Sequence, residues 1–185
     1  MNLRVISGSA KGRKLRSVPG ASTRPVTDWV KEALFDIIAG DVLDSTWFDL
    51  FAGTGAIGIE ALSRGAAFVR FVDNNRQAIE TIRWNLEHCR LVINAEILRM
   101  DAFSLLPGRA DRPFDYVYIA PPQYHDLWSR ALLSLDENAS WLSPDAWVII
   151  QIHPKEYHDM ELKNLVSIDE RKYGNTLLVF LERSR

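Results

Sequence analysis

The sequence contains little of what disulfide-bonded, metal-binding or membrane proteins need. Cys89 is the only cysteine among 185 residues, so neither an intrachain disulfide nor a cysteine-based zinc site can form. The four histidines show no metal-ligand spacing. No apolar run is long enough to span a bilayer, and the N-terminus lacks the apolar segment of a signal peptide. We therefore expect a cytoplasmic protein that binds neither a metal nor a membrane.

Acidic side chains are absent from the first 27 residues, which carry six basic ones. These are Arg4, Lys11, Arg13, Lys14, Arg16 and Arg24. Because the formal charge of the chain is −2, this local charge of +6 leaves −8 on the remainder. A basic segment on an acidic body suggests a polyanionic partner, RNA or DNA. A solvated surface hairpin would have the same composition, so charge alone leaves both interpretations open.

The spacing of apolar residues near the N-terminus predicts two short strands, 3–6 and 14–18, joined by a glycine-containing turn. We accordingly divide the chain into a basic N-terminal hairpin or arm, residues 1–26, and a main domain, residues 27–185. No linker is long enough to separate two large domains, and we expect a monomer.

The main domain alternates short apolar strands with helices. After a helix that begins at Thr27 and stops near Gly40, the predicted strands are 46–51, 68–72, 95–99, 115–119, 146–152 and 176–182. The clearest helices are 56–64, 75–89 and 126–135. This order predicts an α/β fold with a mostly parallel sheet and helices on both faces, and residues 165–172 add an antiparallel edge strand.

A glycine-rich turn directly follows the first predicted strand of this sheet. Gly53, Gly55 and Gly58 fit the pattern G-x-G-x-x-G, which brings backbone N–H groups against a nucleotide-like ligand. The pattern alone fits either NAD or S-adenosylmethionine (SAM). Asp49 favours SAM, since a carboxylate here would oppose a pyrophosphate but attract the ammonium and sulfonium groups of SAM. The alternative is that Asp49 is a buried capping residue.

Further polar residues follow the next three strands. Asp73 could accept hydrogen bonds from ribose hydroxyls, and Asp101 could accept one from an adenine amino group. Residues 120–124 follow the fourth strand. Ligands of such sheets bind at the carboxyl ends of the strands, so these positions are expected to share one site. Each aspartate taken alone is more often a cap or turn residue.

Several segments together resemble the RsmD family. They are Arg4-Val5-Ile6-Ser7-Gly8, Lys11-Gly12-Arg13, Thr23-Arg24-Pro25, Asp49-Leu50-Phe51-Ala52-Gly53-Thr54-Gly55 and Ile59-Glu60-Ala61-Leu62-Ser63-Arg64-Gly65-Ala66. The resemblance extends to Tyr173-Gly174-Asn175-Thr176, and the N-terminal arm with the Leu-Ser-Arg-Gly-Ala ending is its most specific part.

The resemblance implies a Rossmann-like SAM-dependent methyltransferase with a seven-stranded sheet, which modifies the N2 amine of a guanine in 16S ribosomal RNA. The implied partner is this RNA or the assembling small subunit, contacted by the basic arm and Arg24. The cofactor-binding residues that it implies are Asp49, Phe51, Ala52, Gly53, Thr54, Gly55, Asp73, Asn74, Asp101 and Ala102.

The sequence departs from the family pattern after the fourth strand. The family has Asp or Asn, then Pro-Pro, then Tyr or Phe, whereas this chain has Ala120, Pro121, Pro122 and Gln123, with the aromatic Tyr124 one place late. We expect these five residues to form the catalytic turn. The alternatives are a non-catalytic SAM- and rRNA-binding assembly factor and, more distantly, an NAD-dependent oxidoreductase.

Overall fold

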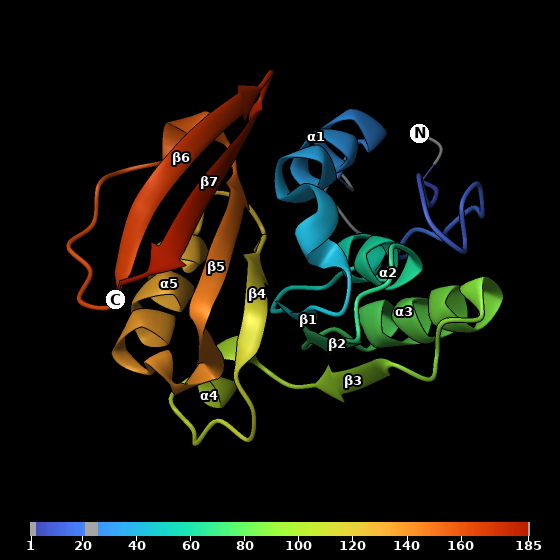
Figure 1. The fold of residues 1–185 in the computed structure, drawn as a ribbon, viewed down its shortest axis with the longest axis horizontal. Coiled ribbons are helices and arrows are strands. Elements are labelled where there is room, and N and C mark those ends of the chain that lie inside the picture. Colours follow the sequence, from blue (N-terminus) through green and yellow to red (C-terminus); the bar gives the residue numbers. More distant parts are fainter. Residues whose placement is uncertain (1–2, 21–25, 185) are drawn as a thin grey trace.

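A seven-stranded sheet organises the computed structural model, which describes residues 3–20 and 26–184 (Figure 1). The strands are β1 (Thr46–Asp49), β2 (Phe68–Asp73), β3 (Ala95–Arg99), β4 (Phe114–Ile119), β5 (Leu142–Ile152), β6 (Leu165–Tyr173) and β7 (Thr176–Arg183). The helices are α1 (Asp28–Ile38), α2 (Ala56–Ser63), α3 (Arg76–Cys89), α4 (Ala102–Leu105) and α5 (Leu127–Glu137). Three short 3₁₀ turns complete the described elements: Ala39–Val42, Ala139–Trp141 and Pro154–Glu156.

The strand order is β3-β2-β1-β4-β5-β7-β6. The first five strands of this order are parallel, and β7 runs antiparallel to both β5 and β6. The chain therefore winds outward from β1 in one direction and from β4 in the other. This confirms the predicted mostly parallel sheet with its antiparallel edge. The switch point lies between β1 and β4, where the carboxyl ends of adjacent parallel strands leave room for a ligand.

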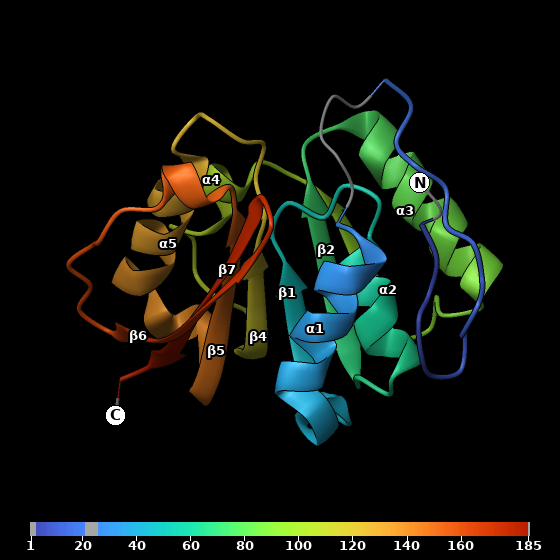
Figure 2. The same ribbon diagram turned by 90° about the horizontal axis from the view of Figure 1, so that it is seen from above.

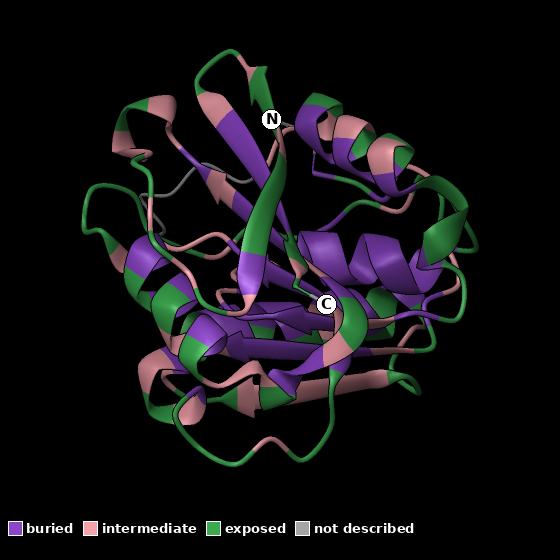
Figure 3. Cartoon of the chain, turned by 60° about the vertical axis from the view of Figure 1, so that its left-hand side comes forward, coloured by how far each residue is buried: buried purple, intermediate pink, exposed green. Residues whose placement is uncertain are grey.

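Helices cover both faces of the sheet, as Figure 2 shows, with α1, α2 and α3 on one side and α4 and α5 on the other. Each layer buries its own apolar cluster, one containing Leu34, Trp47 and Ile82 and the other containing Phe48, Trp128 and Leu135. Alternate residues of β1, Trp47 and Phe48, enter opposite clusters, as expected of a strand covered on both faces. In Figure 3 the buried colour covers much of the central strands and α2, whereas the edge strand β6 is mostly exposed.

Local sequence explains where the helices near the site begin. Thr27 caps α1, its hydroxyl oxygen accepting from the Val30 N–H at 3.3 Å. Asn75 caps α3 in the same way through the Gln77 N–H at 2.8 Å. Such caps satisfy N–H groups that have no partner within the helix. Both predicted helices therefore start within a residue of where the pattern placed them.

Among the described residues, no helix combines the length and apolar character needed to cross a bilayer.

The predicted strands at 3–6 and 14–18 are not formed. A single bridge, Arg4 to Lys14, and a few backbone hydrogen bonds join the two sides of the N-terminal hairpin. The reason lies in α2, because the N–H groups of Ile6 and Ser7 donate to the Glu60 carboxylate rather than to a neighbouring strand. The predicted strand 46–51 likewise ends at Asp49, where the glycine turn begins.

Candidate functional site

The glycine turn lies at the switch point, between the end of β1 and the start of α2. Gly53 and Gly55 have φ values of +55° and +76°, a region that L side chains rarely adopt, so glycine is favoured at both. The third glycine has a different role. A Cβ on Gly58 would lie 2.3 Å from the Phe71 ring, so its absence lets α2 pack directly on β2. All three glycines of the predicted pattern thus have a structural reason.

Asp73, at the end of β2, is hydrogen-bonded to this turn. One of its carboxylate oxygens accepts from the Gly53 N–H at 2.8 Å, and the other accepts from the Asn75 N–H at 2.8 Å. Each carboxylate oxygen can accept a second hydrogen bond. The neighbouring Asn74 is exposed. The structure therefore brings together the first and second predicted strand ends, with acceptor capacity left for a ligand.

Asp49 lies beneath the turn and is 2% exposed. Burial, reinforced by the negative charge of Asp73, raises the pKa of this carboxyl to about 8, while a hydrogen bond from the Gly58 backbone opposes the shift. Among the described residues, its Oδ1 atom has no hydrogen-bond partner. A buried acceptor without a partner is costly, and a cationic donor would satisfy it. The arrangement thus fits an ammonium-bearing ligand and disfavours a pyrophosphate.

Tyr118 and Gln151 extend this row of polar groups across the sheet. Tyr118 on β4 is in register with Asp49 on β1, and its hydroxyl donates to the Gln151 side-chain oxygen at 2.5 Å. Burial, with the nearby Asp49 charge, raises the Tyr118 pKa well above its usual value. Sequence reasoning missed both residues because each lies within an apolar strand segment. A tyrosine one residue before the strand end was the available signal.

The carboxylate that follows the third strand, Asp101, caps helix α4. Its side chain accepts from the Phe103 N–H at 3.3 Å, and Ala102 is buried in the first turn of the helix. The predicted Phe51 packs against Phe103 with ring centroids 6.0 Å apart. Of the remaining predicted residues, Ala52 is buried and Thr54 is half-buried within the glycine turn. The hydrogen bond from the Phe103 N–H shows that Asp101 caps α4, and a contact between Asp101 and adenine stays a prediction.

Residues 120–124 leave the carboxyl end of β4, beside β1. Ala120 packs against the α1–α3 apolar cluster, whereas Pro122 and Gln123 are exposed. Tyr124 has a φ of +67° and is 68% exposed, and its N–H donates to Glu156 at 2.8 Å. The contact with Glu156 holds this tyrosine in a conformation that is uncommon outside glycine. An exposed aromatic ring therefore follows the two prolines at the ligand-binding edge.

A second exposed aromatic group lies at the same edge. Trp29, in the first turn of α1, is 60% exposed and meets Tyr173 edge-on, with ring centroids 5.3 Å apart. Tyr173 pairs with Thr176 at the tip of the β6–β7 hairpin, and the next residue, Leu177, pairs with Ile152 at the carboxyl end of β5. Sequence reasoning did not single out this pair, because its members are 144 positions apart.

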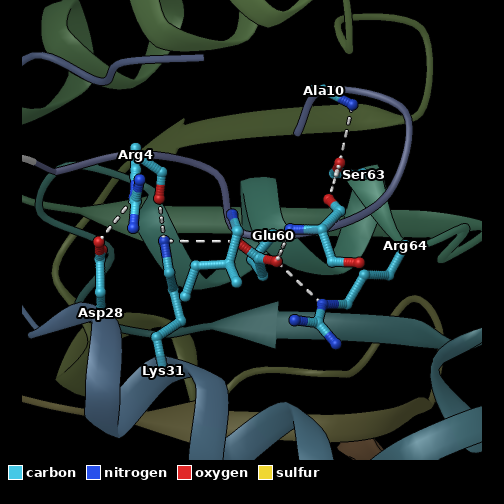
Figure 4. A network of polar contacts seen from close by, with 9 residues as sticks. Arg4, Ala10, Asp28, Lys31, Glu60, Ser63 and Arg64 are labelled. Carbon is cyan, nitrogen blue, oxygen red and sulfur yellow. Dashed lines mark hydrogen bonds and ion pairs between the residues drawn. The ribbon is translucent and has the colours of Figure 1, made fainter. Parts of the chain in front are cut away.

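The N-terminal arm is attached to α2 by a buried polar network (Figure 4). Glu60, fully buried, accepts from the N–H groups of Ile6 and Ser7 and forms ion pairs with Lys31 at 3.3 Å and Arg64 at 2.9 Å. The Ser63 hydroxyl accepts from the Ala10 N–H at 2.9 Å. Burial lowers the pKa of Lys31, although Glu60 opposes this change. The arm is therefore fixed to the helix that begins at the glycine turn.

The predicted RNA-binding residues of the arm differ in their surroundings. Lys11 and Lys14 are exposed. Arg4 pairs with Asp28 at 2.9 Å, and Arg13 donates to the His88 carbonyl. Arg16 places its guanidinium 3.6 Å above the Trp84 ring. Arg24 lies outside the described residues.

A cavity of about 550 Å³ lies elsewhere, against α5, β6 and β7. Trp128, Leu132, Tyr157, His158, Leu165 and Leu181 are among its lining residues. None of the residues lining it belongs to the glycine turn or to 120–124, so it is separate from the candidate site.

The strand order and the glycine turn after β1 define the Rossmann-like fold of SAM-dependent methyltransferases. The family model described as Conserved hypothetical protein 95 matches residues 3–182. The chain belongs to this family, the RsmD family. This confirms the resemblance found in the sequence.

Individual relatives agree with this assignment. The chain is 42% identical to YlbH of Bacillus subtilis over 151 residues, which are 80% of this chain and 82% of YlbH. It is 33% identical to ribosomal RNA small subunit methyltransferase D of Escherichia coli K12 over 149 residues, covering 80% of this chain and 74% of the relative. The solved structure of Escherichia coli yhhF superposes with a TM-score of 0.87 at 30% identity, covering 99% of this chain and 98% of yhhF.

Proposed function

We propose that this protein transfers the methyl group of SAM to the exocyclic N2 amine of a guanine in small-subunit ribosomal RNA. The observation that carries the proposal is a buried Asp49 oxygen at the glycine turn that has no hydrogen-bond partner within residues 3–20 and 26–184. The relative of this chain in Escherichia coli is named ribosomal RNA small subunit methyltransferase D. The RNA substrate follows from this relationship, and the guanine amine follows from the family resemblance.

The glycine turn supplies the cofactor site in this proposal. When bound, SAM supplies an activated methyl group on a sulfonium. Asp49 would accept from its ammonium group, Asp73 would accept from the ribose hydroxyls, and Asp101 with the Ala102 backbone would contact the adenine. Because burial raises the pKa of Asp49, a cationic ligand would stabilise its ionised form, whereas the negative charge of a pyrophosphate would oppose ionisation, so an oxidoreductase fits this site poorly.

The turn at 120–124 would orient the target base. Guanine N2 is a weak nucleophile, and an in-line displacement on a strong electrophile needs mainly positioning and acceptors for the amine hydrogens. Pro121 and Pro122 have no N–H, so no neighbouring donor competes for the carbonyl oxygens of residues 120 and 121. Tyr124 would stack on the flipped-out base, and the Gln123 side chain would restore the acceptor that Ala120 lacks.

The N-terminal arm would provide the sequence-independent part of RNA binding. Lys11 and Lys14 are exposed there, and the buried Glu60 network fixes the backbone that carries them. Trp29 and Tyr173 offer a further stacking surface at the same edge as the catalytic turn. We assign residues 1–26 to this RNA-binding role and residues 27–185 to the methyltransferase domain, and we propose that the protein acts as a cytoplasmic monomer.

The test is methyl transfer to unmodified small-subunit particles. The purified protein is incubated with SAM carrying a labelled methyl group, and label in the RNA is counted against a reaction without protein. The proposal predicts incorporation that reaches about one methyl group per particle. Binding of SAM and RNA without incorporation would replace the enzyme with a binding factor.

A further inference from the structure

A single side chain, that of Asn85, joins the N-terminal arm to the glycine turn. It lies on α3 and is fully buried. Its side-chain oxygen accepts from the Arg16 N–H at 2.7 Å, and its amide nitrogen donates to the Arg16 carbonyl at 3.1 Å. The same nitrogen donates to the Thr54 carbonyl at 2.9 Å. Thr54 belongs to the glycine turn, and Arg16 belongs to the arm.

These three bonds leave Asn85 little freedom. A side-chain amide has two N–H donors, and both are used here. The amide nitrogen donates to the Arg16 carbonyl of the arm and to the Thr54 carbonyl of the glycine turn. The peptide unit after Thr54 is held on both sides, because its carbonyl accepts from Asn85 while the Gly55 N–H donates to Ala52 at 2.7 Å. A shift of either segment would leave a buried polar group without a partner, which is unfavourable.

The rest of α3 supports the same connection. Trp84, the residue before Asn85, lies beneath the Arg16 guanidinium, and the His88 carbonyl accepts from Arg13. The N-terminal end of α3 follows Asp73, whose carboxylate accepts from Gly53. The C-terminal half of α3 thus contacts the arm through Trp84, Asn85 and His88, and Asn85 also contacts the glycine turn.

We propose that Asn85 is a positioning residue that couples the two binding events. Ordering of the glycine turn by the cofactor fixes the Thr54 carbonyl, and through Asn85 it also fixes the arm backbone at residue 16. RNA bound to the arm transmits the same effect from residue 16 through Asn85 to the glycine turn. Because such coupling is reciprocal, each ligand raises the affinity for the other by the same factor. This inference rests on the proposed function of the glycine turn and the arm.

The experiment measures S-adenosylhomocysteine binding by calorimetry, with and without saturating small-subunit rRNA transcript. Wild-type protein should bind S-adenosylhomocysteine about fivefold more tightly, or more, in the presence of RNA, which is the lower end of typical couplings. In Asn85→Asp the oxygen that replaces the amide nitrogen cannot donate to Thr54 or Arg16, and the ratio should fall to about one.

Two variants serve as controls. Asn138→Asp makes the same chemical change in a residue whose amide donates to the Leu106 and Gly108 carbonyls, away from the site, and it should keep the wild-type ratio. Thr81→Val removes a hydrogen bond within α3 itself, from the Thr81 hydroxyl to the Gln77 carbonyl, and it should also keep the coupling. Unchanged coupling in Asn85→Asp would refute the role of Asn85.

A measurement on the wild-type protein decides the matter should Asn85→Asp fail to fold. S-adenosylhomocysteine alone should slow hydrogen exchange of the Arg16 amide while leaving residues 106–109 unchanged. No protection at residue 16, or equal affinity for S-adenosylhomocysteine with and without RNA, would overturn the coupling and leave the proposed function standing. Failure of the wild type to bind either ligand would overturn both.

Discussion

Asp73 accepts a hydrogen bond from the Gly53 N–H at 2.8 Å, so the end of β2 is connected directly to the turn that follows β1. This contact gives the carboxylate two functions. It accepts from one backbone N–H of the glycine turn, and under the proposed function it would also accept from a ribose hydroxyl. The predicted site is therefore assembled through backbone groups as well as through side chains.

Replacement of Asp73 by Ala should weaken S-adenosylhomocysteine binding by roughly tenfold to a hundredfold. This range corresponds to loss of a hydrogen bond to a charged group, about 1.5–3 kcal/mol. Calorimetry measures the affinity, and the melting temperature without ligand shows whether the domain is still folded. Asp73→Asn keeps an acceptor oxygen and should lose less. Wild-type affinity in a folded Asp73→Ala variant would remove Asp73 from the cofactor site.

Asp49 should make both stability and ligand binding depend on pH. Its pKa is raised from 3.8 to about 8, so between those values the folded state holds a proton that the unfolded state has lost. Stability from this group therefore falls as pH rises from about 4 to about 8. A cationic ligand favours the ionised carboxylate, so S-adenosylhomocysteine binding at pH 7 should release a proton.

The proton release can be read from calorimetry in phosphate and Tris buffers, whose ionisation enthalpies differ. The apparent binding enthalpy of the wild type should depend on the buffer, whereas that of Asp49→Asn should not. Identical enthalpies in both buffers for the wild type would mean that Asp49 is already ionised or does not contact the ligand.

The exposed lysines of the arm should set the salt dependence of RNA binding. Each phosphate contact contributes about 0.7–0.9 to the slope of log affinity against log salt concentration. Lys11→Gln with Lys14→Gln should reduce that slope by two such contacts and leave S-adenosylhomocysteine affinity unchanged. Arg109→Gln with Lys163→Gln removes two exposed charges near the opposite edge of the sheet and should not alter the slope. Equal slopes in both double variants would identify the arm as an ordinary solvated hairpin.

Tyr124 should contribute mainly to productive RNA binding. Stacking on a base is worth about 1–3 kcal/mol, so Tyr124→Ala should lower kcat/KM by roughly ten- to a hundredfold.

Gln123→Ala should lower kcat more than it raises KM if its amide acts chiefly in the transition state. Steady-state kinetics on small-subunit particles separate the two effects. Wild-type kinetics in Gln123→Ala would show that the backbone carbonyls suffice.

The sequence predicted the sheet and the first two strand ends because those features are local. An apolar run that stops at Asp49 and Gly53, and another that stops at Asp73, mark strand ends without knowledge of their neighbours. Parallel packing then places them at one edge. The family resemblance also indicated the turn at 120–124 after β4. The contact of Tyr124 in this turn with Glu156 could not be predicted, because the two residues are 32 positions apart.

Other features could not be predicted because they join distant segments. Asn85 contacts Thr54, which is 31 positions away, and Arg16, which is 69 positions away. No local pattern distinguishes Asn85 from a solvated helix residue. The N-terminal strands failed for a related reason, since Glu60 takes the backbone N–H groups of Ile6 and Ser7. Tyr118 and Gln151 lie within apolar strand segments, and their contact with each other forms only when β4 and β5 lie side by side.

The identity of the methylated nucleoside tests the central claim most directly. Unmodified small-subunit particles are treated with SAM and either wild-type protein or Ala120→Asn, which adds the acceptor found at this position in the family. The RNA is then digested and analysed by mass spectrometry. We predict N2-methylguanosine at a single site with the wild type, and equal or faster formation with Ala120→Asn. Product only with Ala120→Asn, or a methyl group on any other atom, would contradict this account.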